Sequence, residues 1–181
     1  MSKISIQKLN LNLTGITEDG EQKESDSSFE APEGCHIVAR LHSGDENGRS
    51  KCKYGRFELS LEAEQLGFGE IVYGERRTVT VKESASDVRC ESGEIIVKRV
   101  HTGDENGNTQ YTLAQVYVRI SGTQILVPCR TGEITHVTVK ESSGNCAESA
   151  GRSMVARSHK GDENKDTTYG FAKIYVTYIT I

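Results

Sequence analysis

Apolar and polar residues alternate along much of the chain with a period of two residues. The alternation is clearest at residues 78–83, 95–101, 111–118 and 124–128, and no segment sustains a helical period. A period of two places every second side chain on the same face of a strand. The pattern therefore predicts an all-β protein in which four such strands form one unit.

One six-residue string, H-x-G-D-E-N, occurs three times. Its histidines are His42, His101 and His159, so the spacings are 101 − 42 = 59 and 159 − 101 = 58 residues. Each string follows V-x-R-x, and a glycine stands eight residues before each histidine. A constant period of this length indicates that each copy is one supersecondary unit that buries its core face against its neighbours. We therefore expect a single domain over residues 1–181, built of three repeats at about 1–74, 75–132 and 133–181.

The turns and the chain ends follow from the same repeat. Asn47-Gly48 and Asn106-Gly107 are typical of type I′ hairpin turns, in which both central residues need a positive φ. Residues 15–34 are polar and acidic and are expected to form a long loop inside copy one. The strand predicted at residues 3–9 is expected to supply the fourth strand that copy three lacks.

Three four-stranded units that each carry V-x-R-x-H-x-G-D-E-N resemble the threefold-repeat lectins, and the resemblance covers the whole chain. It implies carbohydrate binding and a β-prism-like fold, with a β-trefoil as the alternative. The prism is favoured because a repeat of 58 residues is long for a trefoil unit. The Q-x-W of ricin-type trefoils and the Q-x-D-x-N-x-V-x-Y of monocot mannose lectins are absent, so no family binding residue carries over.

The repeated string supplies the candidate binding residues. Residues i, i+2 and i+4 share a strand face, so the arginine and histidine of each copy meet the turn at the hairpin end. Carboxylate and amide oxygens accept hydrogen bonds from sugar hydroxyls, arginine, asparagine and histidine donate them, and tyrosine offers a flat face for C–H packing. We predict a non-enzymatic lectin with three equivalent sites, each weak and strengthened by multivalency. The predicted ligand-binding residues are Arg40, His42, Gly44, Asp45, Glu46 and Asn47 in copy one; Arg99, His101, Gly103, Asp104, Glu105, Asn106 and Tyr111 in copy two; and Arg157, His159, Gly161, Asp162, Glu163, Asn164 and Tyr169 in copy three.

Two other interpretations use the same residues. In the first, the charged residues form only a salt-bridged hairpin end, and the chain is a structural or toxin-associated β module that contacts protein or membrane. In the second, calcium stabilises the module, since Asp104, Asn106 and Asn108 have the spacing that begins a calcium loop. Copy one has Arg49 at the third of these positions and the bidentate glutamate is missing, so we expect no cofactor. Catalysis is disfavoured because the set occurs three times with no unique partner.

Composition and charge restrict the classes of partner that the protein is expected to bind. A net charge of −4 offers no basic surface to nucleic acid, and no apolar segment is long enough to span a bilayer. The expected partners are glycans, and a homo-oligomer is compatible with the sequence. Five cysteines without a C-x-x-C pair indicate reduced thiols. The N-terminal residues lack a signal-peptide pattern, which predicts a cytoplasmic protein or one released without a signal peptide.

Three features outside the repeated string are expected to be exposed. V-T-V-K-E-S occurs at residues 79–84 and 137–142, and we interpret it as an edge strand whose Lys–Glu charges are solvated. His36 and His136 are expected at the surface.

Overall fold

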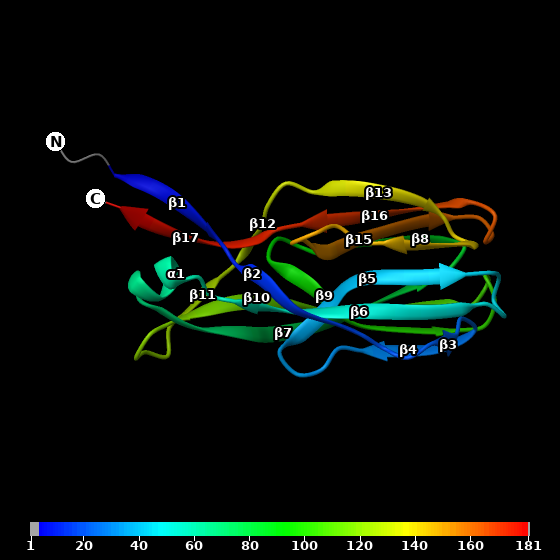
Figure 1. Ribbon diagram of the computed structural model, residues 1–181, viewed down its shortest axis with the longest axis horizontal. Helices are drawn as coiled ribbons and strands as arrows, with labels where there is room; N and C mark the ends of the chain where they lie inside the picture. The colour runs from blue at the N-terminus through cyan, green and yellow to red at the C-terminus, as the bar shows by residue number, and fades with distance from the viewer. Residues whose placement is uncertain (1–3, 181) are drawn as a thin grey trace.

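The computed structural model describes residues 4–180, without the side chains of residues 144–147, and consists almost entirely of strands (Figure 1). Strands make up 66% of it and helix 3%, which confirms the predicted all-β class. The short helix α1 (Leu61–Gln65) begins where the Ser60 hydroxyl accepts a hydrogen bond from the Ala63 amide at 3.1 Å. Within residues 4–180, no helix is long and apolar enough to cross a membrane.

The strands form four sheets. The first contains β14 (Ser143–Ala147), β5 (Cys35–Ser43), β6 (Arg49–Glu58) and β2 (Asn12–Glu18), with β3 (Gln22–Lys23) also beside β6. The second contains β4 (Asp26–Glu30), β9 (Glu94–Thr102), β10 (Asn108–Ile120), β7 (Phe68–Lys82) and β11 (Leu126–Pro128). The third contains β8 (Ala85–Arg89), β15 (Ser153–Lys160), β16 (Asp166–Ala172) and β13 (Thr135–Lys140). The fourth contains β1 (Ser5–Asn10), β17 (Ile174–Thr180) and β12 (Arg130–Thr131).

The first three sheets share one plan, a hairpin with an added strand on each side. The hairpins are β5–β6, β9–β10 and β15–β16, and in each the repeated histidine stands opposite a serine or threonine. On one side lies a strand of the same copy: β2 with β3, β7 or β13. On the other side lies a strand from another copy, because β4 pairs with β9, β8 pairs with β15, and β14 pairs with β5. Copy one thus supplies a strand to the sheet of copy two, copy two supplies one to the sheet of copy three, and copy three supplies one to the sheet of copy one.

This strand exchange does not by itself establish a lectin architecture. A threefold β-prism or β-trefoil plan is not confirmed, and no sheet of the described residues closes on itself. The N-terminal strand does join the end of copy three, since β1 pairs with β17 from Ser5↔Thr180 to Asn10↔Tyr175. Lys3, the first residue of that predicted strand, lies outside the described residues. Residues 15–34 do not form the predicted loop, because β3 and β4 lie within them and pair with β6 and β9.

The hairpin turns differ from the predicted type I′ geometry. No described residue other than glycine has a positive φ, whereas Gly44, Gly103 and Gly161 have φ of 88°, 98° and 109°. The turn itself lies over Asp-Glu-Asn and the next residue, where the Gly48 amide donates to the Asp45 carbonyl at 2.8 Å. Gly48 is required for a different reason, since a Cβ there would lie 1.9 Å from the Ser43 carbonyl oxygen. The prediction of type I′ turns was therefore wrong, because the left-handed residue precedes the turn.

The core lies between the sheets and has two parts. One surrounds Val97, Val116 and Ile174, and the other contains Ile96, Leu113 and the two repeated tyrosines, Tyr111 and Tyr169. As predicted, the cysteines whose side chains are described are free thiols: Cys35, Cys52, Cys90 and Cys129. The side chain of Cys146 lies outside the described part.

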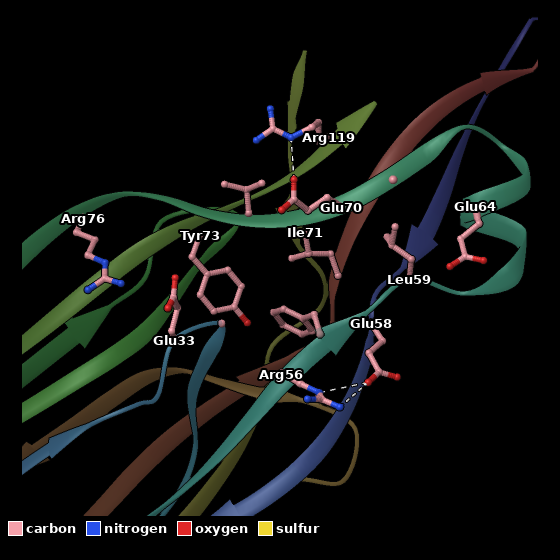
Figure 2. A pocket seen from close by; sticks show the side chains of 14 residues that line it. Glu33, Arg56, Glu58, Leu59, Glu64, Glu70, Ile71, Tyr73, Arg76 and Arg119 are labelled. Atoms are coloured by element: carbon pink, nitrogen blue, oxygen red, sulfur yellow. Dashed lines mark hydrogen bonds and ion pairs between the residues drawn. The ribbon is translucent and has the colours of Figure 1, made fainter. Parts of the chain in front are cut away.

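A cleft of about 660 Å³ opens between the end of β6 and the start of β7 (Figure 2). Its lining includes Glu64 of α1. Helix α1 lies at the end of the molecule opposite the three hairpin turns (Figure 1). Beneath the cleft lies His36, which is fully buried and therefore not at the surface as predicted, whereas His136 is exposed. Burial lowers the pKa of His36 to about 3, so the imidazole is neutral.

Candidate functional site

The chain crosses from one hairpin to the next at a Lys-Glu-Ser segment, at residues 23–25, 82–84 and 140–142. The backbone of this segment holds two turns together. In copy two, the Ser84 amide donates to the Glu105 carbonyl at 2.8 Å, and the Ser84 carbonyl accepts from the Gly161 amide at 2.8 Å. The same pair of hydrogen bonds occurs at Ser25 and at Ser142. The preceding glutamate consequently lies between the hairpin of its own copy and that of the next.

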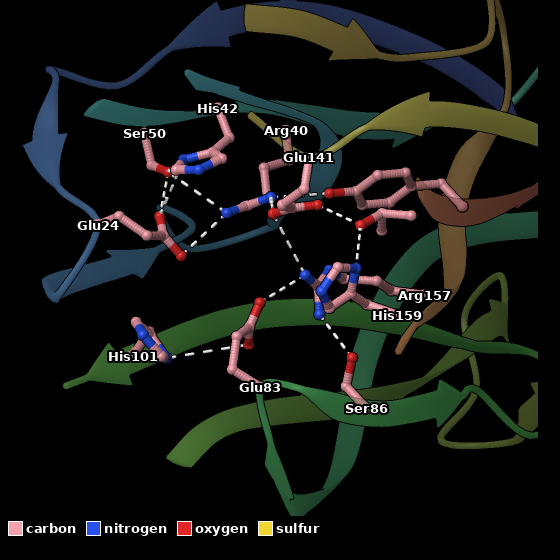
Figure 3. Close-up of polar contacts among 12 residues, drawn as sticks. Glu24, Arg40, His42, Ser50, Glu83, Ser86, His101, Glu141, Arg157 and His159 are labelled. Atoms are coloured by element: carbon pink, nitrogen blue, oxygen red, sulfur yellow. Dashed lines mark hydrogen bonds and ion pairs between the residues drawn. The ribbon is translucent and has the colours of Figure 1, made fainter. Parts of the chain in front are cut away.

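This placement allows each of these glutamates to reach two arginines. The contacts close a ring in the order Arg40, Glu24, Arg99, Glu83, Arg157, Glu141, with successive N–O distances of 2.9, 2.6, 3.7, 2.5 and 3.3 Å, and 2.6 Å from Glu141 back to Arg40. We call these six residues the Arg–Glu ring; Figure 3 shows five of them converging between the hairpins. None of the six is more than 7% exposed. Burying six charges is tolerated because every charge has partners of the opposite sign on both sides.

The arginines of the ring lower the pKa of its three carboxylates. Burial by itself raises the pKa of Glu83. The guanidinium groups of Arg157, Arg99 and Arg40 have the larger opposite effect and lower this pKa to about 2. The pKa values of Glu24 and Glu141 are also lowered by neighbouring arginines against the effect of burial. The three glutamates are therefore ionised at neutral pH and balance the three arginines.

A histidine and a hydroxyl connect the ring to each turn. In copy two, Nε2 of His101 donates to the Gly103 carbonyl at 3.0 Å, and Nδ1 lies 2.8 Å from the Thr109 hydroxyl. The Thr109 hydroxyl donates to the Glu83 carboxylate. His42 with Ser50 and His159 with Thr167 make the equivalent contacts. The histidine thus holds the carbonyl of the glycine at the start of the turn.

The rest of each turn faces solvent. Asp45, Asp104 and Asp162 are exposed, and each accepts a hydrogen bond from the amide of the asparagine two residues on, at 2.8, 2.8 and 3.0 Å. The asparagines are also exposed and donate to the half-buried glutamates between them. Residues of all three turns line one depression of about 30 Å³, which is large enough for about one water molecule. The three predicted sites are therefore brought together at one end of the molecule.

The structure divides the predicted binding residues into two groups. The buried group holds the turns in place: Arg40, Arg99, Arg157, His42, His101, His159, Tyr111 and Tyr169, none more than 5% exposed. The accessible group consists of the glycine, aspartate, glutamate and asparagine of each turn. The second group is therefore open to a ligand. In the first group the three histidines also line the depression, whereas the arginines and tyrosines can act only through the position of the backbone.

The acidic half of the ring was not predicted from the sequence. The Lys-Glu charges of V-T-V-K-E-S were interpreted as solvated, which is wrong for the glutamates: Lys82 and Lys140 are exposed, but Glu83 and Glu141 are 7% exposed. The available signal was the spacing of Glu24, Glu83 and Glu141, 83 − 24 = 59 and 141 − 83 = 58 residues, which equals that of the histidines.

A second missed residue is Cys52. It occupies the position of Tyr111 and Tyr169, since 111 − 52 = 59 and 169 − 111 = 58. The Tyr169 hydroxyl accepts from Arg40 at 2.8 Å, and the Tyr111 hydroxyl accepts from Arg99 at 3.3 Å. Cys52 is fully buried, and burial raises the pKa of its thiol to about 12. In copy one a thiol therefore takes the place of a phenol beside the ring.

The donor set at the hairpin ends consists of carboxylates, amides and buried imidazoles. Among the described side chains, no group of three or more His, Cys, Asp or Glu is arranged to hold a metal ion. The accessible groups can accept hydrogen bonds from hydroxyls and, through the asparagine amides, donate them. The chain matches no protein-family model, no curated protein and no solved structure.

Proposed function

We propose that this protein is a non-enzymatic carbohydrate-binding protein with a threefold, β-prism-like plan, and that its three hairpin ends together form the sugar-binding surface. The observation that supports the proposal is the gathering of three identical Asp-Glu-Asn turns around one depression, above the buried Arg–Glu ring. The ring and the crossover hydrogen bonds keep the turns rigid, so little conformational entropy is lost on binding.

The chemistry of the accessible residues suits hydroxyl groups. Each turn offers two carboxylates and one amide, so one sugar hydroxyl can donate to an oxygen while a neighbouring one accepts from an asparagine. A shallow contact of this kind is weak at a single turn. Three turns held in a fixed arrangement gain avidity on a surface that displays many glycans.

The test is a glycan array with three forms of the protein. The first is the unmodified chain, the second carries Asp104→Ala, and the third carries Asp45→Ala, Asp104→Ala and Asp162→Ala. Each aspartate side chain receives one exposed backbone hydrogen bond, so each change costs about 1 kcal/mol of stability and the fold persists. We expect the single change to lower avidity and the triple change to abolish binding. Asp87→Ala, at an exposed position on β8, serves as the control that leaves binding intact. A triple variant that keeps full binding overturns the proposal.

The second candidate is a structural or toxin-associated β module that contacts protein or membrane through the same end. The observation that favours it is that the repeated side chains already bond within the chain, including the aspartates and asparagines of the turns. In this case none of the three forms of the protein shows a sugar preference on the array. A calcium-stabilised module differs from both, because a chelator then lowers its melting temperature.

A further inference from the structure

The cleft between β6 and β7 has features that the hairpin ends lack. Its volume of about 660 Å³ lies in the range of about 300–1,000 Å³ that small-molecule sites occupy. The depression at the hairpin ends is large enough for only about one water molecule. The cleft therefore has room for a ligand to be surrounded on several sides.

Two ion pairs stand on opposite walls of the cleft (Figure 2). Arg56 and Glu58 lie 3.2 Å apart at the end of β6, and Arg119 and Glu70 lie 2.9 Å apart on β10 and β7. All four side chains are at least 27% exposed, so a ligand can reach them. Each pair places a hydrogen-bond donor beside an acceptor, which matches a hydroxyl group because a hydroxyl donates and accepts at once.

Between these walls lies the half-buried ring of Tyr73 (Figure 2). Its hydroxyl is 2.8 Å from Nδ1 of His36, and Nε2 of His36 is 2.7 Å from the Ser153 hydroxyl. His36 in turn stacks on Phe57 with ring centroids 4.4 Å apart. The polar end of Tyr73 is thus committed to a buried network, and its ring remains as a fixed flat surface. Such a surface packs well against the C–H face of a sugar.

The charges around the cleft nearly cancel. Its lining contains three arginines and four glutamates, 3 − 4 = −1: Arg56, Arg76, Arg119, Glu33, Glu58, Glu64 and Glu70. A phosphate would lie near the glutamates and a polyamine would lie near the arginines, so a highly charged ligand is disfavoured. A neutral ligand with many hydroxyl groups is not repelled by either charge. Its hydroxyls can accept hydrogen bonds from the arginines and donate them to the glutamates.

We propose that this cleft is a second binding site, separate from the hairpin ends, and that its ligand is a short neutral oligosaccharide. One sugar packs on the Tyr73 ring, and its hydroxyls bond to the Arg56–Glu58 and Arg119–Glu70 pairs. Because the cleft shares no residue with the three turns, ligand binding in the cleft does not depend on sugar binding at the hairpin ends.

The test is an NMR titration of the ¹⁵N-labelled full chain with four neutral trisaccharides: maltotriose, cellotriose, mannotriose and tri-N-acetylchitotriose. We expect at least one of them to shift the amide signals of residues 56–59 and 69–73, which line the cleft. Glu70→Gln combined with Arg119→Gln should weaken that binding about tenfold, because it removes charge-assisted hydrogen bonds. Glu18→Gln is the matched control, since it breaks a partly exposed ion pair with Lys51, neither residue of which lines the cleft, and should leave binding unchanged.

Two further measurements separate the possible outcomes. The triple aspartate variant of the hairpin ends should bind the same trisaccharide at the cleft with unchanged affinity, even if it fails on the array. The proposal is overturned if no trisaccharide shifts the cleft signals, or if the Glu70/Arg119 variant binds as well as the unmodified chain. A response only to hexalysine or hexaglutamate also overturns it, because that result assigns the cleft to a charged peptide.

Discussion

The Arg–Glu ring makes the stability of the fold depend on single carboxylates, and Glu141 provides the clearest case. Its carboxylate bonds to Arg40 at 2.6 Å and to Arg157 at 3.3 Å, and it accepts a hydrogen bond from Thr167. Glu141→Gln preserves the shape of the side chain but leaves three buried guanidinium groups against two carboxylates. Removing one partner of a buried ion pair typically costs about 3–5 kcal/mol, because the remaining charge stays buried without compensation.

This loss is large enough to measure by urea unfolding. The chain has no tryptophan, so far-ultraviolet circular dichroism of the strands is the suitable signal. For a protein of this size the same loss lowers the melting temperature by about 10 °C. The matched control is Glu30→Gln, which breaks the exposed pair with Lys98 and should cost about 0–1 kcal/mol.

A double variant tests whether the lost charge balance causes the loss of stability in Glu141→Gln. Glu141→Gln with Arg40→Met leaves two arginines and two glutamates in the ring. Its loss of stability should be smaller than the sum of the two single losses by about 1–3 kcal/mol, because the residues are in direct contact. The reasoning is refuted if Glu141→Gln costs no more than Glu30→Gln, or if the two ring changes are additive.

Two further predictions concern acid and the repeated glycines. The pKa of Glu83 is lowered from 4.5 to about 2, so the stability that it contributes is complete above pH 4.5 and is lost as the pH falls towards 2. The melting temperature should fall across this window, and more gently in Glu83→Gln; equal slopes would contradict the role of the ring. Gly93 and Gly151 occupy the same repeat position with φ of 87° and 68°, but a Cβ on Gly93 would lie 2.1 Å from the Cys129 carbonyl oxygen while one on Gly151 meets nothing within 4 Å. Gly151→Ala should therefore cost about 1–2 kcal/mol for its backbone conformation and Gly93→Ala clearly more, and equal melting temperatures of the two variants would count against this packing argument.

The sequence by itself determined the local structure. Alternation with a period of two predicted strands at residues 78–83, 95–101 and 111–118, which correspond to β7, β9 and β10. The repeated string located the three hairpin ends, because a turn depends on residues that are adjacent in the chain. These features are local, so a single sequence is sufficient to find them.

The tertiary structure alone decided which faces are buried and which strands pair. Arg99 shares a strand face that the alternation identified, but its burial depends on Glu24, which is 75 residues away and belongs to another copy. A period of two specifies that side chains alternate, and it does not specify which face is covered when a neighbouring copy supplies both a strand and a counter-charge. For the same reason the cleft was not predicted: His36, Tyr73 and Ser153 lie far apart in the chain and meet only in the folded protein.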